Sequence, residues 1–189
     1  MTTLKNRLLL VFTIVAATVG LDQWTKQLAI RHLKGKDVIY YLGDLFNLEY
    51  AQNTGAFLSL GESLDPFTKR IVLNALPALL LIGLLVYIFR DRRMTGWQTA
   101  ALAFIVGGGL SNIVDRMTQG YVVDMMHIEL TDTLQTGVFN VADMGIMLGM
   151  FMMLPTVLRG EPKPEETPTP GPADTRPLTP NERPAGGES

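Results

Sequence analysis

The sequence contains no cysteine and only two histidines among 189 residues. A chain without cysteine can form no disulfide, no thiol nucleophile and no cysteine-based metal site. It also lacks a His-Glu-x-x-His pattern, and two carboxylates with the isolated His127 do not make a zinc site. We therefore expect no metal and no cofactor, and we interpret His127 as a solvated or packing side chain. The formal net charge of −2 gives no electrostatic footprint for nucleic acid.

Large apolar side chains are almost missing from residues 161–189, which hold eight of the eleven prolines. Such a segment cannot bury enough surface to offset its ordering entropy, so a disordered Pro-rich tail is expected there. Residues 1–160 are strongly apolar and form the predicted membrane domain.

Four long apolar runs predict four transmembrane helices, at about 8–28, 71–89, 98–117 and 140–158. Residues 71–89 would rise about 28 Å as a helix, close to the ~30 Å hydrocarbon core of a bilayer. The first run also has the basic start and apolar core of a signal peptide. However, no clear cleavage site followed by a soluble domain appears, and the helical pattern continues to Leu28. We expect it to be retained as a span.

The runs of basic residues predict the topology. The positive-inside rule assigns membrane-flanking lysines and arginines to the cytoplasm. They occur at alternate ends of the four runs, which places both termini in the cytoplasm and the intervening polar residues at the outer surface. The flanking residues are Lys5, Arg7, Arg90, Arg92, Arg93, Arg159 and Lys163.

The segments at about 30–65 and 118–138 differ in kind from the spans. Residues 37–42 and 45–50 are rich in β-branched and aromatic types and are split by Gly43 and Asp44, which predicts a hairpin. The pattern of residues 118–138 predicts a short strand and a loop. The fold class expected is an all-α integral membrane protein with four transmembrane helices and a small extracytoplasmic β-sheet or hairpin subdomain.

Charged residues within the spans require an explanation. Asp22 and Lys26 are four residues apart and can pair, either as an interfacial ion pair or as a brace for a polar site. Asn112, Asp115 and Arg116 share another helix face. With Asp143, five charges at mid-membrane would cost about 12–18 kcal/mol on insertion scales. They must lie near one membrane surface or line a wet cavity.

Two carboxylates suggest acid–base chemistry at that surface. Asn140 can cap the last helix, and Asp143 falls in its first turn, where the helix dipole favours negative charge. Asp124 stands nineteen residues earlier. Two close carboxyls share a proton, and we expect Asp143 to be the anion more often. Residues 53–57 fit either a plain turn or a close backbone approach, with Asn53 offering an amide.

Five blocks in this order resemble the lipoprotein signal peptidases, the type II signal peptidases of bacterial membranes. The resemblance spans about residues 8–158. It implies an aspartyl endopeptidase in the inner membrane that cuts prolipoproteins just before a cysteine carrying diacylglycerol. We also expect the chain to be a monomer. Membrane lipid and the prolipoprotein would be its partners. The blocks are Asp22-Gln23-Trp24-Thr25-Lys26, Asn53-Thr54-Gly55-Ala56-Phe57, Gly107-Gly108 through Asn112-Ile113-Val114-Asp115-Arg116, Gly120-Tyr121-Val122-Val123-Asp124 and Phe139-Asn140-Val141-Ala142-Asp143.

Residue roles follow from the resemblance by position. The sequence departs from the family pattern at two positions. Ser111 stands where the family usually has glycine, which is expected to alter the helix spacing. Met125 stands where the family usually has an aromatic residue and is expected on the pocket wall. The implied set comprises the catalytic pair Asp124 and Asp143, the orienting Asn140, the substrate-contacting or supporting Asn53, Gly55 and Arg116, and a network of Asp22, Lys26, Asn112 and Asp115.

Two other classes of protein fit the sequence less well. A proton-conducting transporter would spread its polar residues through the membrane depth, whereas here they collect at one end of the spans. A non-enzymatic scaffold leaves the placement of Asp124 and Asp143 without a purpose.

Overall fold

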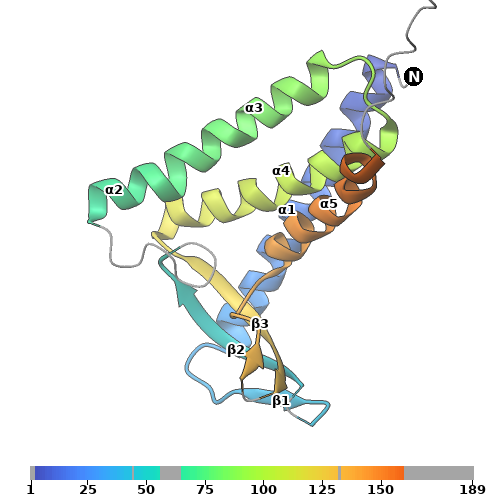
Figure 1. Cartoon of the computed structure of the whole chain (residues 1–189). Coiled ribbons are helices and arrows are strands. Elements are labelled where there is room, and N and C mark those ends of the chain that lie inside the picture. Colours follow the sequence, from blue (N-terminus) through green and yellow to red (C-terminus); the bar gives the residue numbers. More distant parts are fainter. Residues whose placement is uncertain (1–2, 44, 56–64, 132, 160–189) are drawn as a thin grey trace, which may run out of the picture. The chain divides into compact units, whose positions relative to one another are not determined.

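A computed structural model describes residues 3–43, 45–55, 65–131 and 133–159 (Figure 1). The tail expected at 161–189 lies outside the described residues. In chain order the elements are α1 (Leu4–His32), β1 (Ile39–Tyr41), β2 (Phe46–Asn53), α2 (Pro66–Arg70), the π-helical turn η2 (Ile71–Ala75), α3 (Leu76–Arg90), α4 (Gly96–Gln119), β3 (Val122–Thr131), β4 (Leu134–Gln135) and α5 (Val141–Arg159).

Four helical segments of the described chain are long and apolar enough to cross a membrane. They comprise 18 to 29 residues, or about 27–44 Å of helix. The prediction of four apolar helices with a small antiparallel sheet is confirmed. The segments are Leu4–His32, Phe67–Arg90, Gly96–Gln119 and Val141–Leu158.

The second span changes its helical geometry near its start. Asp65 caps α2, because its side chain accepts the N–H groups of Phe67 and Thr68 at 3.1 Å each. Five residues of π-helix then precede α3, which has Pro77 in its first turn. Proline has no N–H to donate to the carbonyl four residues back, so the backbone widens ahead of it.

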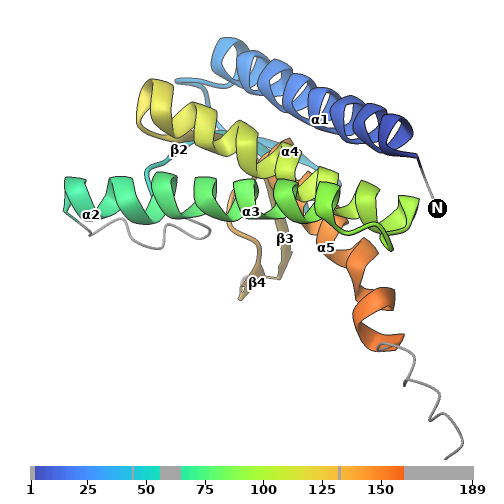
Figure 2. The same ribbon diagram turned by 90° about the horizontal axis from the view of Figure 1, so that it is seen from above.

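Helix α4 is the central element and packs against α1, α3 and α5; Figure 2 shows it between α1 and α3. At Gly108 a Cβ atom would overlap the main-chain oxygen of Ala142, so glycine is what allows α4 and α5 to approach closely. Buried side chains of α1, α3 and α4, together with Met94 of the α3–α4 connection, form the core at one end of the bundle. The helical members are Val11, Ile88, Leu102, Ala103 and Val106.

The sheet is antiparallel, with the order β1-β2-β3-β4. Gly120 ends α4 in the left-handed region, at φ 83°, and the chain turns directly into β3. The expectation of a short strand with loop at 118–138 is wrong in extent: β3 has ten residues, since it pairs along most of β2, and it also pairs with β4. Val123 and Met125 of β3 pack against Ala29 of α1 and Leu33, the residue that caps the end of α1.

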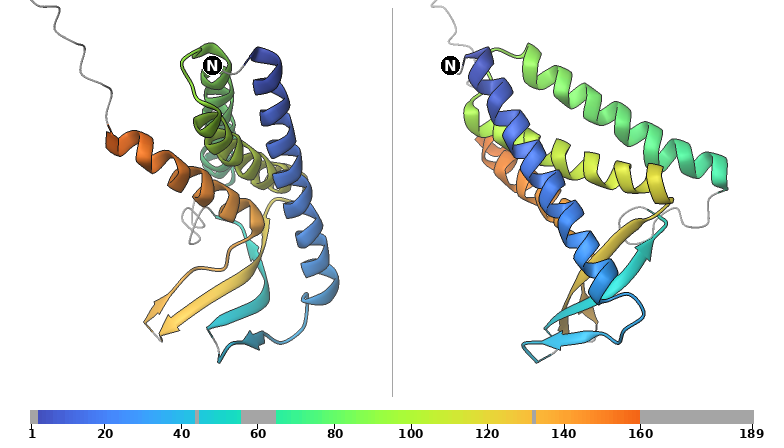
Figure 3. Two further views of the ribbon diagram at one scale, coloured as in Figure 1. Left: turned by 90° about the vertical axis from the view of Figure 1, so that its right-hand side faces the viewer. Right: turned by 180° about the vertical axis from the view of Figure 1, so that it is seen from behind.

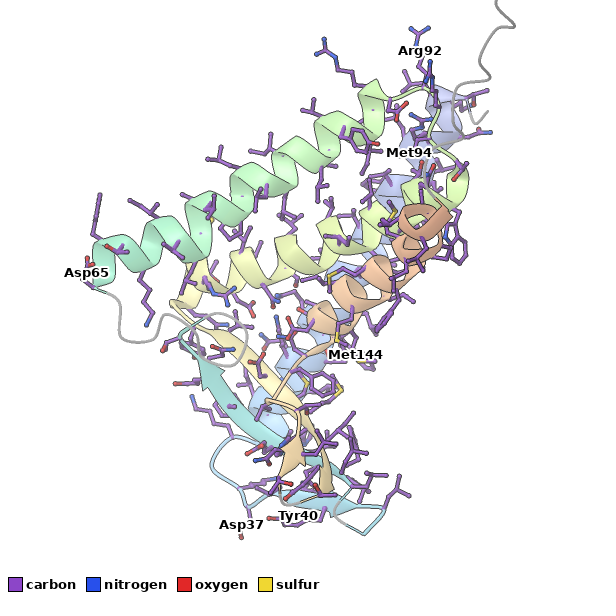
Figure 4. The ribbon with its side chains drawn as sticks, viewed as in Figure 1. Asp37, Tyr40, Asp65, Arg92, Met94 and Met144 are labelled. Carbon is purple, nitrogen blue, oxygen red and sulfur yellow. The ribbon has the colours of Figure 1, made fainter. Side chains whose placement is uncertain are left out.

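The ends of the helices gather in two groups. Arg7 at the start of α1 donates to the carbonyls of Ile88, Asp91 and Met94, so the start of α1, the end of α3 and the start of α4 meet. Arg92 and Met94 lie at this end, beside the start of α1, in Figure 4. The sheet occupies the other end, and Figure 3 shows β2 and β3 running across the C-terminal end of α1.

Candidate active site

Asp124 lies near the beginning of β3, at the end of the sheet nearest α4. The β2–β3 register pairs it with Ala51, which brings Asn53 of β2 diagonally beside it. The Asn53 amide donates from Nδ2 to Asp124 Oδ2 at 3.0 Å. The Asp124 residue is only 2% exposed. A carboxylate outside the spans would ordinarily be solvated. The burial of Asp124 among polar partners is therefore typical of a functional site.

Asp143 lies in the first turn of α5 and forms a reciprocal cap with Asn140. Its N–H donates to Asn140 Oδ1 at 3.0 Å, and its Oδ2 accepts the Asn140 N–H at 3.2 Å. The Asn140 amide also donates from Nδ2 to Asp124 Oδ1. One asparagine side chain therefore connects both aspartates. Met144, the residue after Asp143, marks this junction in Figure 4.

A second amide, Asn112 of α4, completes the connection. Its Nδ2 donates to Asp143 Oδ1 at 2.9 Å, and its Oδ1 accepts from Asn140 Nδ2 at 3.3 Å. Lys26 of α1 donates from Nζ to the same Asn112 oxygen at 3.0 Å. The ammonium group thereby fixes which end of the Asn112 amide faces Asp143.

Lys26 is the centre of a buried ionic network. Its Nζ lies 2.7 Å from Asp22 Oδ2 and 2.7 Å from Asp115 Oδ2. With Asn112, these oxygens match the three ammonium protons. Lys26 is 1% and Asp22 0% exposed. The pair therefore braces the site rather than closing the helix as an exposed interfacial ion pair.

Two polar partners of this network were not assigned a role from the sequence. Gln23 donates from Nε2 to Asp115 Oδ1 at 2.7 Å, and Ser111 donates from Oγ to Asp22 Oδ2 at 2.7 Å. Asp22 Oδ1 also accepts the N–H of Ala142, which ties α1 to the start of α5. Ser111 stands one turn before Asp115, and that spacing was the available signal.

The expectation that Met125 lies on the pocket wall is wrong. Side chains alternate along a strand, so Met125 points to the face opposite Asp124 and packs against Ala29 and Leu33. His127 also points to that face, and its Nδ1 lies 3.5 Å from Glu49 Oε1. It does not contact the two aspartates.

Arg116 connects the site to the segment after β2. Its Nη2 donates to the carbonyl of Gly55 at 2.8 Å, and its Nη1 donates to the carbonyl of Asn112. The N–H of Gly55 donates to Asn53 Oδ1 at 3.0 Å. Residues 53–55 thus form a turn whose side-chain amide reaches Asp124. All ten residues implied by the resemblance are joined in one set of contacts.

Both aspartates line a small cavity of about 40 Å³, together with Asn53, Asn112, Arg116 and Asn140. This volume has room for water. Burial raises the pKa of the Asp124 carboxyl to about 6, and the hydrogen bond from Asn53 offsets part of that rise. A carboxyl that remains protonated at mildly acidic pH next to another carboxyl is suited to acid–base chemistry.

Asp143, Asn112 and Arg116 also line a larger groove of about 550 Å³. Its other walls are apolar side chains of η2, α3, α4 and α5, such as Leu73, Ile113 and Ile146. The groove therefore leads from apolar surface to the polar cavity. Within the described part of the chain, no group of three or more histidine, aspartate or glutamate side chains is arranged to hold a metal ion.

Comparisons with known proteins agree with the motif resemblance. The family model for signal peptidase (SPase) II matches residues 14–159. A lipoprotein signal peptidase of Streptococcus pneumoniae is 30% identical over 152 residues, covering 80% of this chain and 94% of that protein. One from Pelodictyon phaeoclathratiforme is 34% identical over 175 residues, covering 88% and 99%. A solved bacterial membrane enzyme shares the fold, with a TM-score of 0.69 at 22% identity over 81% of this chain and 93% of that one.

Proposed function

The chain belongs to the signal peptidase II family and removes signal peptides from prolipoproteins, and we propose that Asp124 and Asp143 are its catalytic pair. One observation carries this proposal: both carboxylates line one water-sized cavity and are joined through the Asn140 side chain. The membrane-embedded setting and the aspartyl chemistry of the family agree with it.

In the proposed reaction the two carboxyls carry one proton between them. Asp143, at the helix N-terminus, is the anion and removes a proton from water as the water oxygen bonds to the scissile carbonyl carbon. Protonated Asp124 transfers its proton to the carbonyl oxygen. The tetrahedral intermediate then returns that proton to Asp124 and loses the amine, whose nitrogen takes the proton held by Asp143. The pair ends in its starting state.

The groove supports an assignment for substrate binding. Its apolar walls between η2, α3, α4 and α5 suit the apolar stretch of a signal peptide, and its polar end meets Asp143. Arg116 lines both this groove and the small cavity, where its guanidinium can donate to main-chain carbonyls of the bound precursor. We assign the precursor residue that follows the cleaved bond as a diacylglyceryl cysteine, whose acyl chains remain in the lipid.

The orientation follows the positive-inside rule. The start of α1 and the α3–α4 connection share one end of the bundle, where Arg92 and Arg93 are exposed. Assigning this end to the cytoplasm of a bacterial inner membrane places both termini inside and the sheet and active site outside. The enzyme is assigned as a monomer surrounded by lipid. The segment at 30–65, part of which lies outside the described residues, would cover the bound precursor, and cross-linking to a photoreactive substrate tests this.

The deciding experiment uses the full chain in lipid vesicles with a lipobox peptide carrying diacylglyceryl cysteine. We expect cleavage just before that cysteine and little cleavage of the unmodified peptide. Asp124→Asn and Asp143→Asn should each retain less than about 1% of the rate, since acid–base groups contribute on the order of 10²–10⁴. Arg92→Gln, at an exposed site at the other end of the bundle, is the control. A retained rate in either active-site variant ends the pair assignment. Turnover should be unchanged by chelator.

A further inference from the structure

The end of the sheet farthest from the aspartates exposes large apolar side chains. Phe46 pairs with Ile128 there, so the β1–β2 and β3–β4 turns emerge at the same end. This end lies roughly 23 Å along β2 from Asn53. Its apolar residues, called the apolar end below, are Tyr41 (46% exposed), Leu42 (80%), Leu45 (39%), Leu130 (59%) and Leu134 (60%).

Leu42 is unusual in its backbone as well as its exposure. It has φ 54°, and Gly43 after it has φ 66°. Two successive positive φ values suit Asn-Gly or Asp-Gly in a hairpin turn, and a leucine there is strained. Turn formation and solubility therefore both disfavour leucine at this position. Strain of this kind points to a function for the side chain.

The faces of the outer half of the sheet are also unequal. Phe46, Leu48, Met126 and Ile128 share the face of Asp124, because side chains two apart in a strand point the same way. The opposite face carries polar residues, including Asn47, which pairs with His127. Since Asp124 contacts Asn140 at the start of α5, the apolar face lies on the side of α5, whereas the opposite face packs through Val123 and Met125 on the end of α1.

We propose that the apolar end of the sheet lies in the lipid headgroup region of the bilayer, on the side of the membrane where the active site opens. Figures 1 and 3 show the strands crossing the end of α1 rather than continuing along its axis, so the sheet extends sideways from the bundle. Next to four membrane spans, the surface facing that apolar side is lipid. Leucines and a tyrosine at a headgroup boundary gain apolar contact while the tyrosine hydroxyl stays hydrated.

The proposed contact has a consequence for catalysis. The sheet is held at both ends: lipid contacts its turns, and α4 and Asn140 contact it near the active site. It therefore keeps Asp124 at a fixed depth in the membrane. A precursor whose cysteine is attached to lipid presents its scissile bond at a fixed depth too. The inference depends on the spans and not on the identity of the substrate, so its failure leaves the peptidase assignment untouched.

The absence of cysteine allows a direct depth measurement. Full-length Leu42→Cys carries an environment-sensitive fluorophore and is reconstituted, at about one protein per vesicle, in phosphatidylcholine–phosphatidylglycerol vesicles with or without acyl-brominated lipid. We expect a blue-shifted emission and roughly twofold or greater quenching, as for a side chain about 5–10 Å into the headgroup boundary. Leu79→Cys in α3, 66% exposed, is the lipid-facing control, and Asp37→Cys is the aqueous control.

A second variant separates lipid contact from a general effect of the label. With the probe at Leu45→Cys, added Leu42→Ser and Leu134→Ser substitutions should reduce quenching by half or more. Emission at Leu42 equal to that of the Asp37 control, with no effect of bromine, overturns the proposal. So does quenching that appears only after precursor peptide is added, since the apolar end would then bind the substrate. In a separate reconstitution with several differently labelled copies per vesicle, energy transfer between the labels would instead show self-association and would also overturn it.

Discussion

Asn140 and Asp143 satisfy each other at the start of α5: each side chain accepts the main-chain N–H of the other residue, at 3.0 and 3.2 Å. This exchange occupies Asn140 Oδ1 and leaves Nδ2 to reach Asp124. It also holds the Asp143 carboxylate over the positive end of the helix. Helix capping and alignment of the aspartates are therefore done by the same two side chains.

Two substitutions at Asn140 should separate these tasks. Asn140→Ala removes both the helix cap and the contact with Asp124. We expect it to lower the free energy of unfolding by about 0.5–2 kcal/mol and to abolish activity. Asn140→Ser keeps a capping oxygen but is too short to contact Asp124 while capping. It should regain most of the melting temperature and yet lose roughly tenfold or more in kcat. Thermal unfolding in detergent and the cleavage assay measure the two. Equal recovery of both would show that the Asp124 contact is unimportant.

The raised pKa of Asp124 predicts a pH-dependent stability. Burial raises this pKa from 3.8 to about 6, so between these values the folded protein holds a proton that the unfolded chain has released. The contribution of Asp124 to stability is present below about pH 4 and lost as pH rises through about 6. Its size is on the order of 3 kcal/mol. Asp124→Asn carries no such titration, so the wild type should lose stability relative to it from pH 4 to 7. A constant difference would contradict the shift.

The same group should shape the pH dependence of kcat/KM, which reports ionisations of the free enzyme. Activity should fall on the alkaline side as Asp124 loses its proton. The hydrogen bond from Asn53 lowers the pKa of Asp124. Asn53→Ala should therefore move the alkaline limb to higher pH, whatever it does to the maximal rate. A limb that stays in place or moves to lower pH would assign the titration to another group.

Local spacing is what made much of this site predictable. Asn140 and Asp143 are three residues apart in a helix start, and Asp22 and Lys26 are one turn apart, so their contacts follow from helix geometry alone. The four apolar runs and the hairpin at 37–50 could also be predicted, because their signals lie in residues that are close together in the sequence. That Asp124 joins them was implied only by the motif resemblance, because a loop or strand between two helices can take many paths.

Spacing along the chain, as distinct from the family resemblance, predicted no contact between distant segments. Asn112 reaches both Lys26 and Asp143 because α4 lies close to α1 and α5, and no spacing along the chain encodes this. Ser111 was expected to change only helix spacing, yet its hydroxyl donates to Asp22. The length of β3 depends on its pairing with β2. In each case the deciding partner is far away in the sequence.

Loss of Lys26 should be costly, and the cost should be partly reversible. Lys26→Met leaves Asp22 and Asp115 without their cation inside the protein, which destabilises by about 3–5 kcal/mol. Adding Asp115→Asn removes one uncompensated charge, so the double variant should melt at a higher temperature than Lys26→Met alone. Lys36→Met, at an exposed site, is the control and should change little. A double variant less stable than the single one would exclude charge imbalance as the cause.

The close approach of α4 to α5 should be required for activity as well as for stability. A Cβ at Gly108 would overlap the main-chain oxygen of Ala142 and come within 2.8 Å of Ile146 Cγ1. Because Ala142 lies between Asn140 and Asp143, the helix start must move away from Asn112. We expect Gly108→Ala to cost about 1–3 kcal/mol in unfolding free energy and to reduce kcat by more than its effect on folded yield.

Gly83 of α3 provides the matched control, since a Cβ there would meet nothing within 4 Å. Alanine favours a helix by about 0.5–1 kcal/mol over glycine, so Gly83→Ala should be neutral or slightly stabilising. If both alanine variants behave alike, helix propensity rather than helix spacing governs the result. If Gly108→Ala alone loses activity while remaining folded, the distance between α4 and α5 sets the alignment of Asp143 with Asp124.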